Sequence, residues 1–344
     1  MHTLFLNEHN RIAGELKSRL GSALASVDSA DEFLFQETRK IIGAQLQNIV
    51  YKEYLPVVLG SSAMVANGLI FVDETNYDPG VDPSIFNEFA TVAYRFGHST
   101  VRDIINNWRL RSHFFNSAGI DGVHPDNFIV GNGGTNWMNE MKAAIQEPSP
   151  KNDLIIGDAL RNHLFDPPHS LPENLVARNI QRSREHGIST YQGLRGVCGL
   201  STLGNTAPPP EINQTSWEAL LATFSSFENI EPFTGGLAGN APADGIVGPL
   251  FACIIGRQFR RLKDGDRYFY THTSANNARG LGENTKQSVL MRTLGHIICD
   301  NTDAVSTQRN VFRENSTNNP FENCSDIEGL NFDCIVNDLI GNHF

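Results

Sequence analysis

The feature that most constrains the fold is the spacing of the apolar residues, which follows the period of a helix along most of the chain. A first stripe at this spacing begins almost at once and consists of Phe5, Ile12, Leu16 and Leu20. Gly21 marks the end of this helix. Alternation typical of strands is nearly absent, and the best candidate for a short strand is the run 267–271. The pattern predicts a mainly α protein with long loops and little β structure.

Two further helix starts carry local signals. Ser29 and Glu32 form a capping box, and Pro56 and Gly60 should end the helix that follows. Its predicted apolar stripe is Phe35, Ile42, Leu46 and Ile49. Asp82 followed by Pro83 predicts a second start, because proline suits the first turn of a helix. The stripe of that second helix would be Ile85, Phe89, Val92 and Phe96. Other helical patterns lie near 153–165, 172–186, 215–226, 246–262 and 284–298, whereas 115–150 has the composition of a loop with short helical pieces.

The length and net charge of the chain limit which kinds of protein it can be. We find neither an internal repeat nor a linker, so we expect one domain that spans all 344 residues. The net charge of −11 gives no reason to expect binding to nucleic acid or to an anionic membrane. No apolar run approaches the roughly 18 residues that a transmembrane helix needs. We therefore expect neither a nucleic-acid partner nor a transmembrane segment.

One turn of predicted helix places Arg95 and His98 on nearly the same face, because they lie three residues apart. Gly97 between them removes a side chain beside the histidine, so a flat group could approach the backbone there. His98 could be a metal or haem ligand, or a hydrogen-bonded histidine on a half-buried helix. The residues alone do not decide between these two interpretations.

A second polar cluster lies at 179–187, where Asn179 and Arg182 stand among several other polar side chains. It indicates either a buried polar network or an ordinary solvated helix end. His9 also invites a metal interpretation, but the second histidine of an H-E-x-x-H motif is missing, so we interpret His9 as structural.

The five cysteines all lie in the second half of the chain, and none forms a C-x-x-C pair. Structural zinc is therefore not expected, and the cysteines are either buried thiols or partly paired in disulfides. Three glycosylation sequons, which begin at Asn213, Asn315 and Asn323, favour an exported protein.

Several long motifs follow one another along the chain, and their succession resembles that of the animal haem peroxidases, within the peroxidase and cyclooxygenase superfamily. These motifs are MHTLFLNEHNRIAGELKSRL at 1–20, FQETRKIIGAQLQNIVYKEYLPVVLG at 35–60, YRFGHST at 94–100, NIQRSREHG at 179–187, VGPLFACIIGRQFRRLKDGDRYFY at 247–270 and IICDNT at 297–302. The resemblance covers almost the whole chain and is weakest at 101–178 and 203–245.

The resemblance implies a role for each residue of the two polar clusters. In that family the histidine of the R-[FY]-G-H motif is the axial ligand of the haem iron, which here would be His98. The asparagine that opens the second motif, here Asn179, accepts a hydrogen bond from the other ring nitrogen and so fixes the ring. Arg95 and Arg182 match arginines that hold the haem propionates. The implied cofactor is haem b, with its iron bound by His98.

The resemblance also pairs four of the cysteines. The family disulfides correspond to Cys198 with Cys253 and Cys299 with Cys324, which leaves Cys334 unpaired. Two such bridges would indicate an oxidising compartment.

The same resemblance places the distal histidine, the catalytic arginine and the calcium loop of the family before the segment that matches residues 1–4. We therefore expect the N-terminal part of the domain to be missing and this chain to hold the proximal side of the haem site only. No catalytic residue is assigned within it, and calcium is expected only for the full-length domain. The missing signal peptide would belong to the same upstream part.

The implied function is that of a secreted peroxidase, which uses haem and H₂O₂ to oxidise small halide, phenolic or tyrosyl substrates. An extracellular or cell-surface partner is possible for such a protein, and the fragment by itself is expected to be inactive. The alternative is a non-catalytic secreted module of the same fold that serves in binding or adhesion. A cyclooxygenase or fatty-acid dioxygenase relative is a weaker alternative, because the tyrosine and channel residues of such enzymes cannot be placed.

Overall fold

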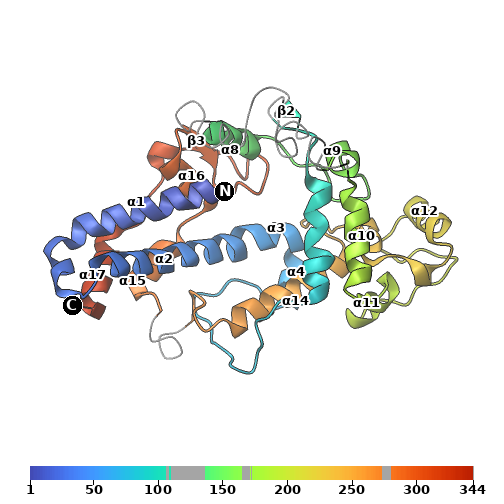
Figure 1. Ribbon diagram of the computed structural model, residues 1–344, viewed down its shortest axis with the longest axis horizontal. Coiled ribbons are helices and arrows are strands. Elements are labelled where there is room, and N and C mark those ends of the chain that lie inside the picture. Colours follow the sequence, from blue (N-terminus) through green and yellow to red (C-terminus); the bar gives the residue numbers. More distant parts are fainter. Residues whose placement is uncertain (106–107, 110–135, 165–170, 172, 273–279, 344) are drawn as a thin grey trace. The chain divides into compact units, whose positions relative to one another are not determined.

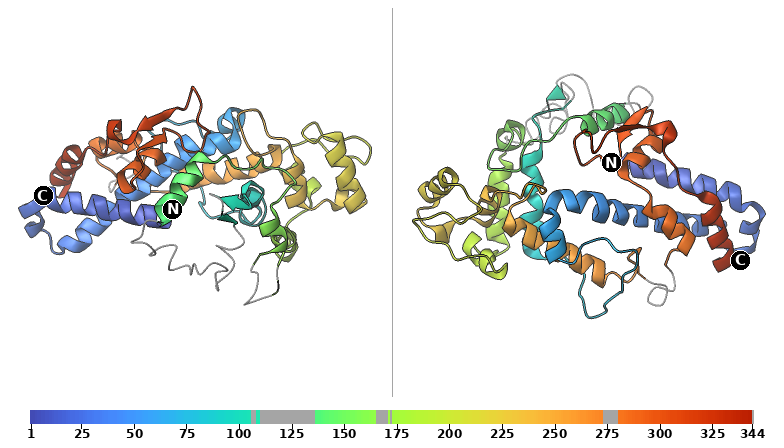
Figure 2. Two further views of the ribbon diagram at one scale, coloured as in Figure 1. Left: turned by 90° about the horizontal axis from the view of Figure 1, so that it is seen from above. Right: turned by 180° about the vertical axis from the view of Figure 1, so that it is seen from behind.

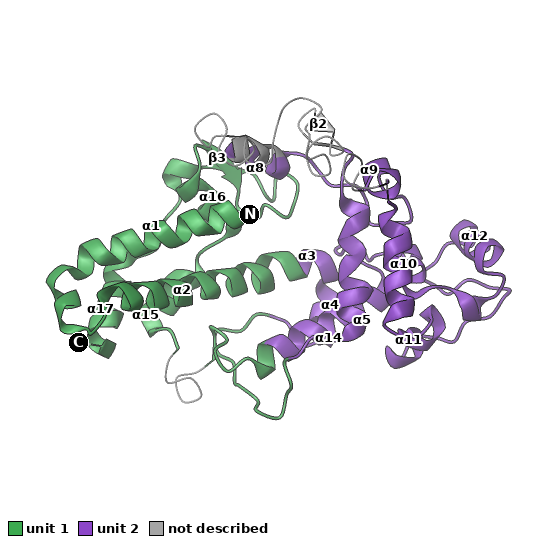
Figure 3. Ribbon diagram, viewed as in Figure 1, with its two compact units in different colours: residues 1–55, 71–83, 263–344 green, residues 56–70, 84–262 purple. Residues whose placement is uncertain are grey.

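The computed structural model describes residues 1–105, 108–109, 136–164, 171, 173–272 and 280–343 (Figure 1). These residues form two compact units, each assembled from separate stretches of chain (Figure 3). Unit 1 comprises Met1–Leu55, Phe71–Pro83 and Lys263–Phe344, and unit 2 comprises Pro56–Ile70 and Ser84–Leu262. Helices provide most of the regular structure in both units, which confirms the predicted mainly α class.

Unit 1 is built around a pair of long helices, α1 and α2, which lie against each other (Figures 1 and 2). Its elements are α1 (His2–Leu20), η1 (Gly21–Ser26), α2 (Ala30–Ile49), η2 (Val50–Tyr54), α15 (Glu283–Leu290), α16 (Leu294–Asn301), β3 (Ser306–Gln308), β4 (Phe321–Asn323), η5 (Cys324–Asp326) and α17 (Phe332–His343). Strands β3 and β4 pair antiparallel, with Thr307 opposite Glu322. Helix α1 also contacts α16 and α17, so its buried residues Leu4, Ile12 and Leu16 belong to the core of this unit.

Unit 2 consists mostly of shorter helices. Its elements are α4 (Ser61–Ala66), α5 (Asn87–Thr91), η3 (Ala93–Thr100), β1 (Ile104–Ile105), β2 (Trp108–Arg109), α8 (Asn136–Gln146), α9 (Asp158–Asn162), α10 (Leu175–Glu185), α11 (Tyr191–Val197), α12 (Gln214–Phe224), η4 (Phe227–Asn229) and α13 (Pro232–Ala238). Two more helices, α3 (Leu55–Leu59) and α14 (Pro249–Gly265), contain points at which the chain passes from one unit to the other. Helix α13 contacts both α10 and η3, which are the elements that carry the predicted site.

The local signals predict the end of the first helix and the start of the second, but Pro56 does not stop the second: helical structure continues after α2 through η2 and α3 to Leu59, just before Gly60. Helix α1 ends at Leu20, and Gly21 follows with a φ of 50°, a value that glycine adopts readily. Helix α2 begins after Ser29, whose side chain accepts a hydrogen bond from the backbone N–H of Glu32.

The predicted apolar stripe of α2 is largely wrong. Phe35 and Leu46 are 46% and 39% exposed, and Ile42 is only partly buried. The face that is buried instead includes the polar side chains of Glu37, Thr38, Gln45 and Asn48. Apolar periodicity does not mark these buried positions, because their side chains are polar.

The predicted helix start at Asp82 and the predicted strand at 267–271 are both wrong. In each segment a glutamine side chain accepts a hydrogen bond from a backbone N–H. No helix starts at Asp82: α5 starts at Asn87, and the N–H of Phe86 donates to Gln258 Oε1 at 2.6 Å. The run 267–271 forms turns and not a strand, because the N–H of Tyr270 donates to Gln47 Oε1 at 3.0 Å.

The predicted helix at 284–298 is two helices, α15 and α16, separated by a turn. Side chains of α2 and η2 bind carbonyl groups at the end of α15 and in this turn. Asn48 Nδ2 donates to the carbonyls of Val289 (3.1 Å) and Arg292 (2.8 Å), and Lys52 Nζ donates to that of Leu290 (2.8 Å). These bonds satisfy carbonyls that a continuous helix would have paired internally.

Other predicted elements differ in extent. Helix α9 covers only part of the predicted 153–165, and most of the predicted loop at 115–150 lies outside the described residues. Among the described helices, none is both long and apolar enough to cross a membrane.

Glu53 is a buried carboxyl group in the π-helical segment η2. It is 6% exposed, its Oε1 accepts a hydrogen bond from the N–H of Leu294 at 3.1 Å, and its Oε2 has no partner among the described residues. Burial raises the pKa of Glu53 to about 8, although the Leu294 N–H and the charges of Lys52 and Arg309 act in the opposite direction. Glu53 is therefore protonated in the folded chain at neutral pH.

We expect this group to make the chain less stable as the pH rises. The folded state holds the Glu53 proton more tightly than the unfolded state, so its contribution is complete below the ordinary value of 4.5 and is lost as the pH rises through about 8. Urea unfolding of Glu53→Gln should lack this loss, which amounts to a few kcal/mol on the order-of-magnitude scale of a pKa shift. The exposed Glu74→Gln is the control and should follow the wild-type profile. Equal profiles for Glu53→Gln and the wild type would contradict this expectation.

Candidate haem-binding site

The 3-10 helix η3 carries both Arg95 and His98. Residues three apart in a 3-10 helix lie one above the other, so the two side chains project from one face. Phe96 is 4% exposed and belongs to the core. A Cβ atom added to Gly97 would meet no described atom within 4 Å. The segment therefore presents a histidine and an arginine beside open space, as the spacing of these residues predicts.

Helix α10 supplies the asparagine of the site. The helix is capped by Asn174, whose Oδ1 accepts a hydrogen bond from the N–H of Ala177 at 3.0 Å. One turn later Asn179 is fully buried, and its side chain contacts two residues of η3. Asn179 Nδ2 lies 2.8 Å from His98 Nδ1, and Asn179 Oδ1 lies 3.0 Å from Arg95 Nη1. Three of the four predicted site residues thus form one hydrogen-bonded group.

The direction of these bonds follows from the chemistry of arginine. A guanidinium group has only donors, so the atom that faces Arg95 must be the amide oxygen of Asn179. The amide nitrogen then faces the ring and donates to His98 Nδ1. The family resemblance implies that the asparagine accepts a hydrogen bond from the ring, and that role stays a prediction.

The imidazole of His98 is electrically neutral at neutral pH. Burial lowers the pKa of His98 below its usual value, and the positive charge of Arg95 lowers it further. Its Nδ1 is held by Asn179, whereas its Nε2 has no hydrogen-bond partner among the described residues. A neutral ring with one nitrogen held by Asn179 and the other without a partner among the described residues can bind a metal through Nε2 once the ring proton lies on Nδ1.

Arg182 lies on α10, three residues after Asn179, and pairs with Glu185 at 2.7 Å. Both side chains are more than two-fifths exposed, so this pair is accessible to solvent. Arg95 binds the carbonyl of Ala90 and the amide of Asn179 but no carboxylate among the described residues. Its pKa is lowered by burial and by the nearby charge of Arg182. Two guanidinium groups that raise the local positive potential favour an anion between or beside them.

The remaining polar residues of the 179–187 cluster anchor the end of α10. His186 Nδ1 and Asn87 Oδ1 lie 2.8 Å apart, and Arg184 pairs with Glu231 at 2.7 Å. These contacts connect α10 with α5 and with the residue before α13. The cluster therefore combines one buried site residue with a polar helix end, so both interpretations drawn from the sequence apply to part of it.

A second buried connection holds η3, and no sequence pattern predicts it. Ser99 Oγ, next to His98, donates to Asn152 Oδ1 at 2.7 Å. Asn152 Nδ2 in turn donates to the carbonyl of Ile246 at 2.9 Å. Ser99 and Asn152 are 1% and 7% exposed, so these bonds are shielded from water. No motif in the sequence marks Asn152, because its partner is 53 residues away.

His9, the other histidine considered as a metal ligand, has a different environment. Its ring lies 5.6 Å from the ring of Phe35, and its Nδ1 lies 3.4 Å from Asn10 Oδ1. The described residues contain no group of three or more side chains that could hold a metal ion.

Both disulfides implied by the resemblance are confirmed. Cys198 is bonded to Cys253 with a Cα separation of 6.1 Å, and Cys299 to Cys324 with a separation of 5.3 Å. Cys334 is a free thiol, as expected.

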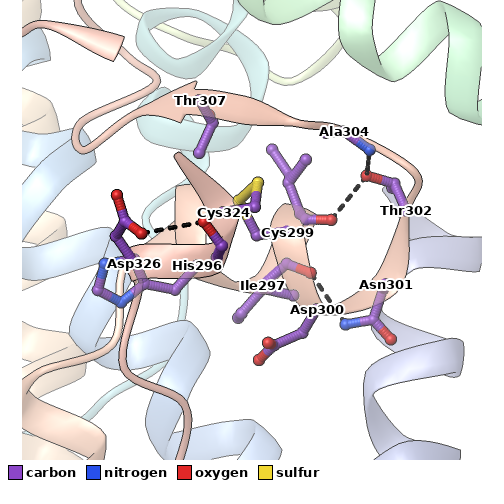
Figure 4. The surroundings of a disulfide bond; sticks show 12 residues. His296, Ile297, Cys299, Asp300, Asn301, Thr302, Ala304, Thr307, Cys324 and Asp326 are labelled. Atoms are coloured by element: carbon purple, nitrogen blue, oxygen red, sulfur yellow. Dashed lines mark hydrogen bonds between the residues drawn. A yellow bond between two sulfur atoms is a disulfide. The ribbon is translucent and has the colours of Figure 1, made fainter. Parts of the chain in front are cut away.

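At the end of α16, beside the disulfide between Cys299 and Cys324, side chains donate hydrogen bonds to backbone carbonyls of the helix (Figure 4). Asn301 Nδ2 and Thr302 Oγ1 donate to backbone carbonyls four residues earlier, at 2.9 and 2.8 Å. The motif at 297–302 therefore encodes both a bridge and a helix end.

Comparison with known proteins identifies the family. The family model for animal haem peroxidase matches residues 1–312. Human eosinophil peroxidase is 35% identical over 96% of this chain and 45% of its own length, and the peroxidasin homolog pxn-2 of Caenorhabditis elegans is 34% identical over 96% of the chain and 24% of its own length. The solved structure of peroxidase A from Dictyostelium discoideum superposes with a TM-score of 0.69 at 30% identity, over 90% of this chain and 56% of that one.

The chain belongs to the animal haem peroxidase family. It spans less than half the length of these two relatives.

Proposed function

We propose that this chain forms the proximal side of a haem peroxidase, with His98 as the axial ligand of the iron. The proposal rests on the hydrogen-bonded group of His98, Asn179 and Arg95 in a chain that belongs to this family. The open space beside Gly97 and the free Nε2 of His98 fit a flat, metal-bearing cofactor. All of residues 1–344 belong in this proposal to one peroxidase domain.

Each site residue has one task. Haem b, when bound, supplies the redox chemistry with H₂O₂, for which small halide, phenolic or tyrosyl compounds are the proposed reducing substrates. His98 offers a neutral ring nitrogen, and Asn179 restricts rotation of that ring from the opposite side. Arg95 and Arg182 offer guanidinium groups to the two propionates, since planar donors bind carboxylates in pairs of hydrogen bonds.

The proposed location is outside the cell. Two disulfides are typical of proteins that fold in an oxidising compartment. The asparagines of all three sequons, Asn213, Asn315 and Asn323, are exposed and thus accessible to glycosylation. An extracellular or cell-surface partner belongs to the same proposal.

The test is to titrate the folded chain with haemin, to record the Soret band, and to assay guaiacol oxidation with H₂O₂. We expect saturable binding with a spectrum typical of histidine ligation, and turnover well below that of a full-length family member assayed in parallel. A folded chain that binds no haemin would contradict the proposal and would favour the non-catalytic binding or adhesion module instead.

A further inference from the structure

Unit 2 contains a cavity whose described lining includes none of the four proposed haem-site residues. The cavity has a volume of about 200 Å³ and lies between the segment 154–156, α9, the start of α10, and α13. Helix α10 contacts both α9 and α13, and all these elements belong to the same compact unit (Figure 3). The cavity is therefore a feature of one unit and needs no contribution from the other.

The walls of this cavity are apolar. Ile156, Phe233 and Leu237 line it and are buried, so these walls are part of the core of the unit. Val176 adds a further apolar side chain from α10. A dry cavity of about 150 Å³ with similar walls binds benzene. A volume of about 200 Å³ therefore fits one benzene ring with a short substituent.

Three polar side chains line the same cavity. The guanidinium group of Arg161 and the hydroxyl group of Thr234 have no hydrogen-bond partner among the described residues. The amide oxygen of Asn174 accepts the N–H of Ala177, which leaves the amide nitrogen of Asn174 available to donate. All three groups can donate hydrogen bonds, and a few polar groups in an otherwise apolar cavity are typical of a small-molecule site.

The charge of Arg161 determines which substituent the site favours. The arginines of the neighbouring helix α10, Arg178, Arg182 and Arg184, each pair with a glutamate. Arg161 has no such carboxylate among the described residues, although it is exposed at the surface of α9. A guanidinium group binds a carboxylate through two parallel hydrogen bonds, so a ligand with a carboxylate would complete this site.

We propose that this cavity binds a small aromatic carboxylate, with one benzene ring between the apolar walls and the carboxylate at Arg161. Burial of the ring supplies the main attraction, and the charge of Arg161 selects an anion over a neutral compound of the same shape. The proposal does not depend on the proposed function, because the four haem-site residues take no part in it.

The first experiment measures the binding of phenylacetate to the haem-free chain by NMR. The methyl signals of Ile156 and Leu237, assigned with Ile156→Val and Leu237→Met, report on the walls of the cavity. We expect saturable shifts of these signals at millimolar phenylacetate. Phenylacetamide has the same ring without the charge and should bind about tenfold more weakly, as expected for the loss of one charge-assisted hydrogen bond. Acetate has no ring and should cause no saturable shift.

Two variants separate the charge from the cavity. Arg161→Leu should weaken the binding of phenylacetate about tenfold and leave that of phenylacetamide as in the wild type. Val176→Phe places a ring in the cavity and should abolish the binding of both compounds. The matched control is Arg178→Leu, which removes an exposed arginine of α10 that pairs with Glu173 and does not line the cavity. It should bind phenylacetate as the wild type does.

Several results would overturn the proposal. One is the absence of shifts at Ile156 and Leu237 with phenylacetate. Another is an equal affinity for phenylacetate and phenylacetamide, or an unchanged affinity for phenylacetate in Arg161→Leu. Acetate binding as strong as that of phenylacetate would indicate an adventitious ion only. If Val176→Phe does not fold, Arg161→Leu decides, because Arg161 is exposed and its side chain has no partner among the described residues. Failure of the chain to bind haemin would leave all of these results unchanged.

Discussion

Replacing His98 with alanine is expected to abolish the Soret spectrum of histidine-ligated haem, and added imidazole is expected to restore it. The variant removes the ring that Asn179 holds at this site, while Asn179 itself stays buried. Loss of an axial ligand should weaken haemin binding by at least roughly 100-fold, since changes to mere supporting residues already cost about 10- to 100-fold. Free imidazole can occupy the space that the side chain leaves and can bond to the same amide.

The control for this variant is His9→Ala. His9, on α1, is the other histidine considered as a metal ligand, but its ring lies against that of Phe35 on α2. We expect haemin titrations of His9→Ala to match those of the wild type. An unchanged Soret band in His98→Ala would show that another residue binds the iron.

Replacing Glu8 with alanine should cause the largest loss of stability. Glu8 is fully buried on α1 and accepts hydrogen bonds from Arg11 (2.7 and 2.9 Å) and from Asn301 (2.8 Å), with Arg292 at 3.5 Å. Alanine would leave the guanidinium groups of Arg11 and Arg292 with Asp300 as their remaining carboxylate partner among the described residues. Breaking a buried pair in this way costs about 3–5 kcal/mol, which denaturant unfolding can measure.

Two comparisons make this expectation specific. Glu15→Ala removes an ion pair from the same helix, but this pair with Arg19 is two-fifths exposed and should be worth less than about 1 kcal/mol. The second comparison is pH: burial raises the pKa of Glu8, but the bonds from Arg11 and Asn301 and the charge of Arg292 outweigh it and lower the pKa. The stabilisation by Glu8 should therefore be complete above its ordinary pKa and be lost on acidification. An equal loss of unfolding free energy in Glu8→Ala and Glu15→Ala would contradict this expectation.

Short-range signals in the sequence predict those parts of the fold that depend on short-range contacts. Gly21 ends α1 and Ser29 caps α2, because each acts on residues within one turn. The spacing of Arg95 and His98 likewise predicts their common face. The disulfides and the place of Asn179 are not encoded in local patterns, and only the family resemblance suggests them.

Other features depend on partners that are far away in the sequence. The buried face of α2 contains Asn48, which binds carbonyls of a turn more than 200 residues later. The turn at Tyr270 forms because Gln47 takes its N–H. Periodicity treats such polar residues as exposed, so it assigns the wrong face to α2 and a strand to a turn.

The two hydrogen bonds beside His98 also determine when the proposed iron-binding position is formed. Ser99 and His98 are held by Asn152 and Asn179, which follow them by 53 and 81 residues. Contacts between such distant segments require the closure of long loops and so form late in folding. Competence to bind a cofactor should therefore appear only with the final packing of η3 against α10, and a newly made chain would not bind haem at His98 until that packing is complete.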